Sequence, residues 1–439
     1  MVHPTYRNAE MQGAPGAQWL CSPEIEAFVI RRFLTLGSGE AVSRLLYLLA
    51  FVALARGLGK AALGEFGLAL TVTSYLVLTV QQGFDQIAVR AVARDPALLQ
   101  TYVRGLAGLR LSIAAMVYLL LAIYLQWHPA GPPESSLLLI LGAICFTTAA
   151  APRWAFQLLS PRRFALANIF SQLIFCAGAL AAISGKGIGW AAGSYLLGDA
   201  VAAAYLLRSA REHCDPSPAW SPPFWRILVS QSWPLSLSAV LGIVVYNFDI
   251  LALGWLATPS DVGLYLACYR CVTVFSPLIS VLQLSILPAY ANAFPDRQRL
   301  KEGIRKVSIP SIAAACLVAL TLNFYPRELL HLIYGNDYAG GAAILRLLAW
   351  SLPLQVFRSV LRQVLLAANL QSLDTVNMAM AAIVSIAIDI AFIPHLGPFA
   401  CAIATVSSEA TLLIAAAAVL RIKVFPRSSR RSATLKRSV

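Results

Sequence analysis

The chain has 439 residues, of which 59% are hydrophobic and only 12% charged, and its formal net charge is +14. A soluble domain has roughly 45–50% apolar and about 25% charged residues, so this composition excludes an ordinary soluble protein. It does not indicate a nucleic-acid partner either, because an excess of Arg and Lys in a membrane protein reflects the positive-inside bias of its loops.

Apolar segments of membrane-spanning length, roughly 20 residues each, recur along most of the chain. They predict an all-α, polytopic membrane protein with about twelve transmembrane helices. The expected spans are 33–55, 62–88, 107–127, 135–156, 164–184 and 187–207, followed by 228–257, 261–291, 307–325, 341–367, 372–393 and 397–420.

These spans group into two lobes of six around a central cavity. A proline-rich connection in the middle of the chain separates them. The predicted units are an N-terminal tail (1–32), an N-lobe (33–207), an interlobe loop (208–227), a C-lobe (228–420) and a basic C-terminal tail (421–439).

Basic residues indicate which loops face the cytoplasm. They gather in both tails and in alternate loops. The opposite set of loops contains only Arg56, Lys60, Lys186 and Arg327. This asymmetry predicts that both termini are cytoplasmic.

The two halves show weak self-similarity. Residues 63–69 resemble residues 262–267, and each segment lies where the first span of its half turns into the second. Because each half has an even number of spans, the halves have the same orientation and are related by an axis along the membrane normal. A substrate site between the lobes is the expected consequence.

Charged side chains inside the spans are candidates for function, because a charge in hydrocarbon is costly and usually faces the bundle interior or a water-filled path. Glu40 and Arg44 are spaced i,i+4 and are equally suited to pair with each other. Asp249 and Arg270 are equally suited to join the seventh and eighth spans as an ion pair. The acidic candidates for proton or Na⁺ coupling, or for such pairs, are Glu40, Asp85, Asp249, Asp389 and Glu409, with Asp199 as a further carboxylate.

Arginines in the tenth span predict a phosphate site. Ser351, Gln355, Arg358 and Arg362 follow one another at steps of four, three and four, which places them on one helical stripe. A guanidinium stays charged and binds phosphate through two parallel hydrogen bonds. Snorkelling to the cytoplasmic interface is the alternative for these arginines. The candidates for lining a diphosphate and glycan cavity are Arg44, Arg56, Arg270, Arg346, Arg358 and Arg362.

Several signals of other chemistry are absent from the sequence. It has no G-x-x-x-x-G-K-[ST] motif for ATP, no H-E-x-x-H motif and no histidine cluster at ligand spacing. Cys268 and Cys271 form a C-x-x-C pair without the second pair that a zinc site needs. We therefore expect a transporter without cofactor or metal, and not an enzyme.

Short motifs in a consistent order resemble polysaccharide exporters of the Wzx type. They cover residues of about 35 to 420. The matching segments are 55–59, 64–67, Gly83 and Arg90 in the first half, and 248–251, Gly254, 262–265, 269–270, 332–339 and 345–350 in the second.

This resemblance implies the multidrug/oligosaccharidyl-lipid/polysaccharide exporter fold. It further implies that the protein moves an undecaprenyl-diphosphate-linked oligosaccharide, such as an O-antigen, capsule or exopolysaccharide repeat unit, across the bacterial inner membrane. Membrane lipid and a polysaccharide polymerase are then candidate partners. Arg44, Arg56, Asp249 and Arg270 fall at motif positions of the family. Nothing apolar follows Leu420, unlike the fourteen-span pattern of lipid II flippases.

Two other functions remain open from the sequence. A multidrug cation antiporter of the same fold would have acidic and aromatic cavity residues, whereas the tenth-span stripe carries arginines. A membrane glycosyltransferase or polysaccharide polymerase would be expected to have a sizeable outer loop, whereas the longest one here, about 325–340, is short.

Overall fold

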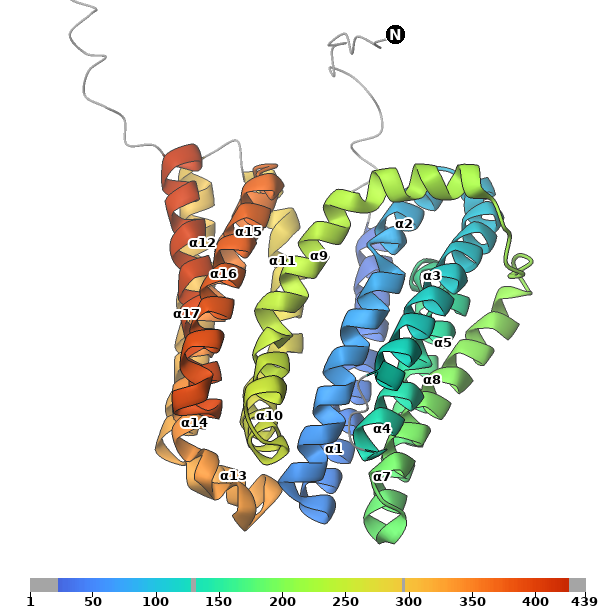
Figure 1. Cartoon of the computed structure of the whole chain (residues 1–439). Helices are drawn as coiled ribbons and strands as arrows, with labels where there is room; N and C mark the ends of the chain where they lie inside the picture. Colours follow the sequence, from blue (N-terminus) through green and yellow to red (C-terminus); the bar gives the residue numbers. More distant parts are fainter. Residues whose placement is uncertain (1–22, 128–131, 294–296, 426–439) are drawn as a thin grey trace, which may run out of the picture.

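The computed structural model describes residues 23–127, 132–293 and 297–425, and this part of the chain contains helices and no β-strand. The helices form two groups that lie side by side (Figure 1). One group contains the helices up to α8, and the other begins with the long α9. The two groups correspond to the predicted lobes. The outer parts of both predicted tails, 1–22 and 426–439, lie outside the described residues.

The N-lobe is built from the first half of the chain. Its helices are α1 (Pro23–Gln81), α2 (Phe84–Arg94), the 3₁₀ turn η2 (Pro96–Leu98), α3 (Leu99–Trp127), α4 (Pro132–Gly142), α5 (Ile144–Ala150), α6 (Arg153–Leu159), α7 (Pro161–Ala181), the π-helical turn η3 (Ala182–Lys186) and α8 (Ile188–Ala210).

The C-lobe is built from the second half. Its helices are α9 (Pro222–Leu256), α10 (Pro259–Thr273), α11 (Ser276–Ala293), α12 (Arg297–Phe324), α13 (Pro326–Tyr334), the 3₁₀ turn η4 (Asn336–Gly341), α14 (Ala342–Ala349), α15 (Ser351–Ala367), α16 (Gln371–Leu396), α17 (Pro398–Val419) and the π-helical turn η5 (Leu420–Val424).

The described helices agree with a multi-pass membrane fold. Nine of them are long and apolar enough to cross a membrane, or ten if one bent pair counts as a single span. This number treats the whole of α1 as one helix, although Gly59 inside it is not helical (φ 80°, ψ 177°). The kink at Gly59 separates the first two predicted spans, and α10 with α11 covers the predicted eighth span.

Two predicted spans of the N-lobe are interrupted. The second one, 62–88, is broken at Gln82 and Gly83, which have positive φ values of 39° and 70°. These two residues separate α1 from α2. The fourth is broken at Pro152, which has no N–H to donate to a helix, so α6 begins there with a bend of 47°. Both breaks bring charged residues of the adjoining helices into the interior of the N-lobe.

The interlobe connection is shorter than predicted and packs on the N-lobe. α9 begins at Pro222, so only about ten residues link it to α8, and the indole N–H of Trp225 donates to the Gly105 carbonyl on α3. Asp215 lies 3.5 Å from Arg104. Hydrogen bonds from the hydroxyl and the N–H of Ser217 lower the pKa of the Asp215 carboxyl. The connection is therefore attached to α3 by both polar and aromatic contacts.

Two glycines form a close backbone contact between the lobes, near α13. A Cβ atom on Gly64 would lie 1.8 Å from the Pro259 carbonyl oxygen, and one on Gly263 would lie 1.8 Å from the Lys60 carbonyl oxygen. The contact is therefore symmetric: Gly64 meets Pro259, four residues before Gly263, and Gly263 meets Lys60, four residues before Gly64. The similarity between residues 63–69 and 262–267 therefore corresponds to a two-fold-like contact, in which α1 and α10 touch backbone to backbone. We call this end of the molecule the α13 end.

Replacing Gly64 by Ala should separate α1 from α10 at the α13 end. The new methyl group would overlap a backbone carbonyl that has no rotamer to change, and overpacking of this kind costs about 1–3 kcal/mol. Distances between spin labels on α1 and α10 should lengthen. Gly242→Ala is the matched control, because a Cβ at Gly242 meets nothing within 4 Å. Unchanged distances in Gly64→Ala would contradict the close contact.

Candidate functional site

Arg270 lies on α10, at the contact between the lobes. The start of α10 is fixed by Pro259 in its first turn and by a capping box, in which the side chains of Thr258 and Asp261 each accept a hydrogen bond from the other residue's backbone N–H. Arg270 falls in the last turn of this helix. The local sequence therefore fixes where α10 begins. It thereby also fixes the position of Arg270, which faces the first arm of α1, the part before the kink at Gly59.

Aromatic rings surround the Arg270 guanidinium. Its Cζ atom is 5.2 Å from the ring centroids of Tyr47 and of Phe51, and its Nη2 donates to the Tyr47 hydroxyl at 3.2 Å. Its Nε is buried without a hydrogen-bond partner, and no carboxylate of the described chain pairs with it. Arg270 is thus a half-buried cation held by π faces, with donor capacity left for an anion.

Arg358, in contrast, has a carboxylate partner. Its Nε donates to Glu409 at 2.7 Å, and its Nη2 donates to the Tyr246 hydroxyl at 2.8 Å. Both charged side chains are almost fully buried, with 7% and 3% exposed. In this conformation the pair joins α15 to α17 and leaves Arg358 little capacity for a substrate.

Three further candidate arginines also have partners. Arg362 pairs with Asp374 at 2.8 Å, and Arg44 pairs with Glu40 at 2.7 Å with both side chains about half exposed. Arg56 donates to the carbonyls of Leu332 and Ile333 on α13, and so links the lobes at the α13 end.

Arg346 is exposed on α14. Of the six arginines predicted to line the cavity, Arg270 alone is half-buried between the lobes without a carboxylate partner.

The acidic candidates lie in two lobes. Asp85 pairs with the buried Arg110 at 2.6 Å inside the N-lobe. Asp249 is buried in the C-lobe, where it accepts hydrogen bonds from the Ile250 N–H and the Tyr265 hydroxyl. The ion pair between Asp249 and Arg270 that the sequence allowed is not formed in the described chain.

Asp389 is a buried carboxylate without a counter-charge. It is 0% exposed, and neither of its oxygens has a hydrogen-bond partner of normal geometry among the described residues. The side chains that interact with its carboxylate are Asp249, through charge, and Ser385, through its hydroxyl. Thr405 completes this group, because its hydroxyl lies 3.1 Å from that of Tyr265. Two acidic residues and several hydroxyls therefore meet inside the C-lobe, on α9, α10, α16 and α17.

A polar pocket in the N-lobe was not predicted from the sequence. Arg153 falls near the end of the predicted span 135–156, and nothing in the sequence linked it to Asp199. The break at Pro152 directs Arg153 into the lobe, where its Nη2 donates to Asp199 at 2.5 Å. The other oxygen of Asp199 accepts from Thr147, also at 2.5 Å. The pair lines a pocket of about 360 Å³. A proline inside a predicted span was the one signal in the sequence that could have indicated it.

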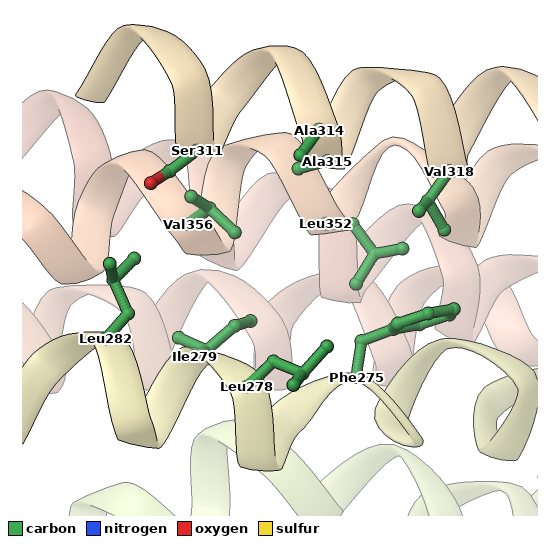
Figure 2. A pocket seen from close by; sticks show the side chains of 10 residues that line it. All are labelled: Phe275, Leu278, Ile279, Leu282, Ser311, Ala314, Ala315, Val318, Leu352 and Val356. Atoms are coloured by element: carbon green, nitrogen blue, oxygen red, sulfur yellow. The ribbon is translucent and has the colours of Figure 1, made fainter. Parts of the chain in front are cut away.

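Not every pocket can recognise a charged substrate. Figure 2 shows side chains from α11, α12 and α15 that point toward one another around a space of about 240 Å³. Ser311 is the only polar side chain among those that line it. The walls of this pocket therefore offer almost no partner for a charged ligand.

These features define a two-lobed, polytopic helical membrane protein with charged groups enclosed in each lobe and a half-buried arginine, Arg270, between them. A model of the family described as "polysaccharide biosynthesis protein" matches residues 29–294, which is more than half of the chain. The chain belongs to this family. No curated protein sequence matches it significantly.

Solved structures share the fold at low sequence identity. The lipid II flippase MurJ in an inward closed conformation is 15% identical, with a TM-score of 0.72 over 89% of this chain and 88% of that chain. An inward-facing multidrug resistance MATE family transporter is also 15% identical, with a TM-score of 0.69 over 90% and 96%. A MOP superfamily transporter from Pyrococcus furiosus is 16% identical, with a TM-score of 0.63 over 94% and 98%. The predicted fold is thereby confirmed.

Removing Arg358 alone should destabilise the C-lobe. Arg358→Ala leaves Glu409 buried and unpaired, and breaking a buried pair in this way costs about 3–5 kcal/mol. Thermal unfolding of the detergent-solubilised protein would measure the loss. Replacing both residues by Leu should recover most of the stability, because no buried charge then remains. A single substitution without effect would show that the pair does not hold α15 to α17.

Proposed function

We propose that this protein is a flippase for a polyprenyl-diphosphate-linked oligosaccharide, which it moves from the inner to the outer leaflet of a bacterial cytoplasmic membrane. The repeat unit of an O-antigen, capsule or exopolysaccharide is the substrate class. The observation that carries the proposal is Arg270, a half-buried cation between the lobes that has no carboxylate partner and keeps an unpaired donor. Membership of the polysaccharide biosynthesis family supports the same substrate class.

The physical need for such a protein is plain. A diphosphate and several sugar hydroxyls cannot cross hydrocarbon without partners for their charges and hydrogen bonds. In our proposal the diphosphate binds at Arg270, the sugars cross in the polar interior, and the polyprenyl chain stays in the lipid. Arg270 suits the diphosphate because a guanidinium binds phosphate oxygens in a fixed, forked geometry.

Alternating access requires a contact between the lobes that can open. The contact of Gly64 with Gly263 closes the α13 end, which carries Lys60 and Arg327 and is, by the distribution of basic residues, the outer side. Both termini are then cytoplasmic. Rocking of the two lobes would break this contact and expose Arg270 to the opposite side.

Coupling to an ion gradient is the second part of the proposal. Two buried carboxylates, Asp249 and Asp389, repel each other when both are charged, and a proton or a cation bound between them would remove that repulsion. Binding of a proton or Na⁺ there would change the charge inside the C-lobe during each cycle. The hydroxyls of Tyr265, Thr405 and Ser385 supply further oxygen atoms around the carboxylates.

Replacing Arg270 by Ala should reduce translocation by about 10- to 100-fold, because hydrogen bonds to charged groups contribute about 1.5–3 kcal/mol. The measurement uses proteoliposomes that contain a fluorescent undecaprenyl-diphosphate oligosaccharide. It follows the fraction of label that becomes accessible to an impermeant quencher or glycosidase. Arg270→Lys should keep part of the rate, since it retains the charge but not the fork. The exposed Arg162→Ala on α7 is the control and should be unaffected.

A wild-type rate in Arg270→Ala would move the diphosphate site elsewhere. Absence of translocation by the wild-type protein, together with efflux of a cationic dye, would contradict the flippase and favour the multidrug antiporter.

Asp389→Asn should uncouple transport from the ion gradient. The amide cannot take up a proton or neutralise a cation, so the rate with an imposed proton or Na⁺ gradient should fall to the rate without one. The same proteoliposomes measure both rates. Asp337→Asn, on the exposed turn η4, is the matched control and should respond to the gradient as the wild type does. If Asp389→Asn still responds fully, the coupling site is not in this cluster.

A further inference from the structure

The polar pocket of the N-lobe lies against the proposed diphosphate site. Its walls come from the second arm of α1, from α5, α6 and α8, and from Ile243 of α9, so that both lobes contribute. Tyr195 is one of its lining residues. The Tyr195 ring is 6.5 Å from the ring of Tyr47, which in turn stacks under Arg270. Only two aromatic rings separate the pocket from the unpaired guanidinium.

The polar groups of the pocket are neutral in sum. Arg153 and Asp199 form an ion pair, with 25% and 15% of their side chains exposed, so the pocket offers strong donors and acceptors without net charge. This differs from Arg270, whose charge has no counterpart. A neutral, hydroxyl-bearing group fits the pocket better than a second anion does.

Thr73 provides independent evidence that the pocket is built for a ligand. It is 4% exposed, lines the pocket, and its hydroxyl has no hydrogen-bond partner in the described part of the chain. An unpaired buried hydroxyl costs free energy, and native proteins seldom leave one without a reason. The Nε of Arg153 is likewise buried and unpaired. The neighbouring Thr71 differs, because its hydroxyl donates to the Gly67 carbonyl.

The size and the apolar walls of the pocket also match a single sugar ring. Its volume of about 360 Å³ is near the lower end of the roughly 300–1,000 Å³ of ligand pockets. Leu70, Val77, Ile144 and Ile243 form apolar walls beside the polar groups. A sugar ring presents hydroxyls at its rim and C–H groups on its faces, so it can use both kinds of wall at once.

We infer that this pocket binds a neutral sugar of the lipid-linked oligosaccharide, close to the diphosphate, through Arg153, Asp199 and Thr73. The inference rests on the proposed function and assigns one part of the substrate to one site. The diphosphate is held by charge at Arg270, and the adjoining sugar by hydrogen bonds in the N-lobe. Asp199 and Arg153 keep lone pairs and donors beyond those they exchange with each other, and Thr73 supplies a hydroxyl that can donate or accept.

The test compares two ligands that differ only in the sugar. Binding to the purified, full-length protein in detergent is measured for two diphosphate diesters of equal charge: the methyl ester of farnesyl diphosphate, which has no sugar, and farnesyl diphosphate carrying one neutral N-acetylhexosamine. Wild-type protein should bind the sugar-bearing ligand more tightly. Thr73→Val removes one hydroxyl at constant shape, so it should weaken the sugar-bearing ligand by about 3- to 10-fold and leave the binding of the methyl ester unchanged. Thr71→Val, two residues away, should change neither ligand.

Asp199→Asn provides a second variant, with a larger expected loss of about 10-fold or more for the sugar-bearing ligand, because the bond it removes is charge-assisted. Its thermal unfolding is compared with that of the wild type. If Asp199→Asn does not fold, Thr73→Val decides the question.

Each outcome bears on the inference. Equal wild-type affinity for both ligands, or equal loss for both in Thr73→Val, would overturn the sugar site while leaving the diphosphate site of Arg270 intact. If neither ligand binds to the wild type, the proposed function itself fails, and the sugar site with it. If the sugar effect is present but proteoliposomes show no translocation, the pocket stands as a sugar site and the flippase assignment fails.

Discussion

A charge inside a bilayer has to find its counter-charge within the protein, and this requirement determines where most of the charged residues of the spans lie. A buried pair is stable only while both partners are present. In the part of the chain that the structure describes, four pairs meet the requirement, and each joins two helices of the same lobe: Arg110 with Asp85, Arg153 with Asp199, Arg358 with Glu409, and Arg362 with Asp374. None of these pairs joins the two lobes. These four ion pairs therefore hold each lobe together without fixing one lobe to the other.

The lobes meet through a shared apolar cluster on α1 and α10, and through backbone contacts and hydrogen bonds beside it. At the α13 end, Gly64 and Gly263 allow the backbones of α1 and α10 to touch, and Arg56 donates to carbonyls of α13. Along α9, the Tyr75 hydroxyl donates to Ile243, and Ser236 donates to the Gln82 carbonyl. Each of these hydrogen bonds has an uncharged acceptor. Each contributes about 0.5–1.5 kcal/mol of net stabilising free energy, or somewhat more where an arginine is the donor. A rocking motion of the lobes would have to open these hydrogen bonds and part of the shared apolar cluster, but none of the four ion pairs within the lobes.

The sequence predicts much of this architecture because hydropathy is a property of whole segments. Each of the twelve expected spans falls on helical structure, and the repeated Gly64 and Gly263 indicated matching turns. Side-chain pairing is harder to predict, because it depends on how helices face one another. The tenth-span stripe was recognised, but its arginines turn toward Glu409 and Asp374. The Arg153–Asp199 pair was missed because it depends on a bend at Pro152, which a continuous span did not anticipate.

Under the proposed function, the distribution of charge gives the two halves of a lipid-linked substrate different kinds of site. A diphosphate is common to every polyprenyl-linked glycan, so a single unpaired guanidinium such as Arg270 serves it whatever sugars follow. The sugars are neutral at most positions and differ between glycans, so they need hydrogen-bonding groups of fixed geometry without net charge. A paired arginine meets that need better than a free one, because Asp199 orients the guanidinium of Arg153 while cancelling its charge. The same residue type can thus serve binding in two ways, and the presence or absence of a carboxylate partner decides which.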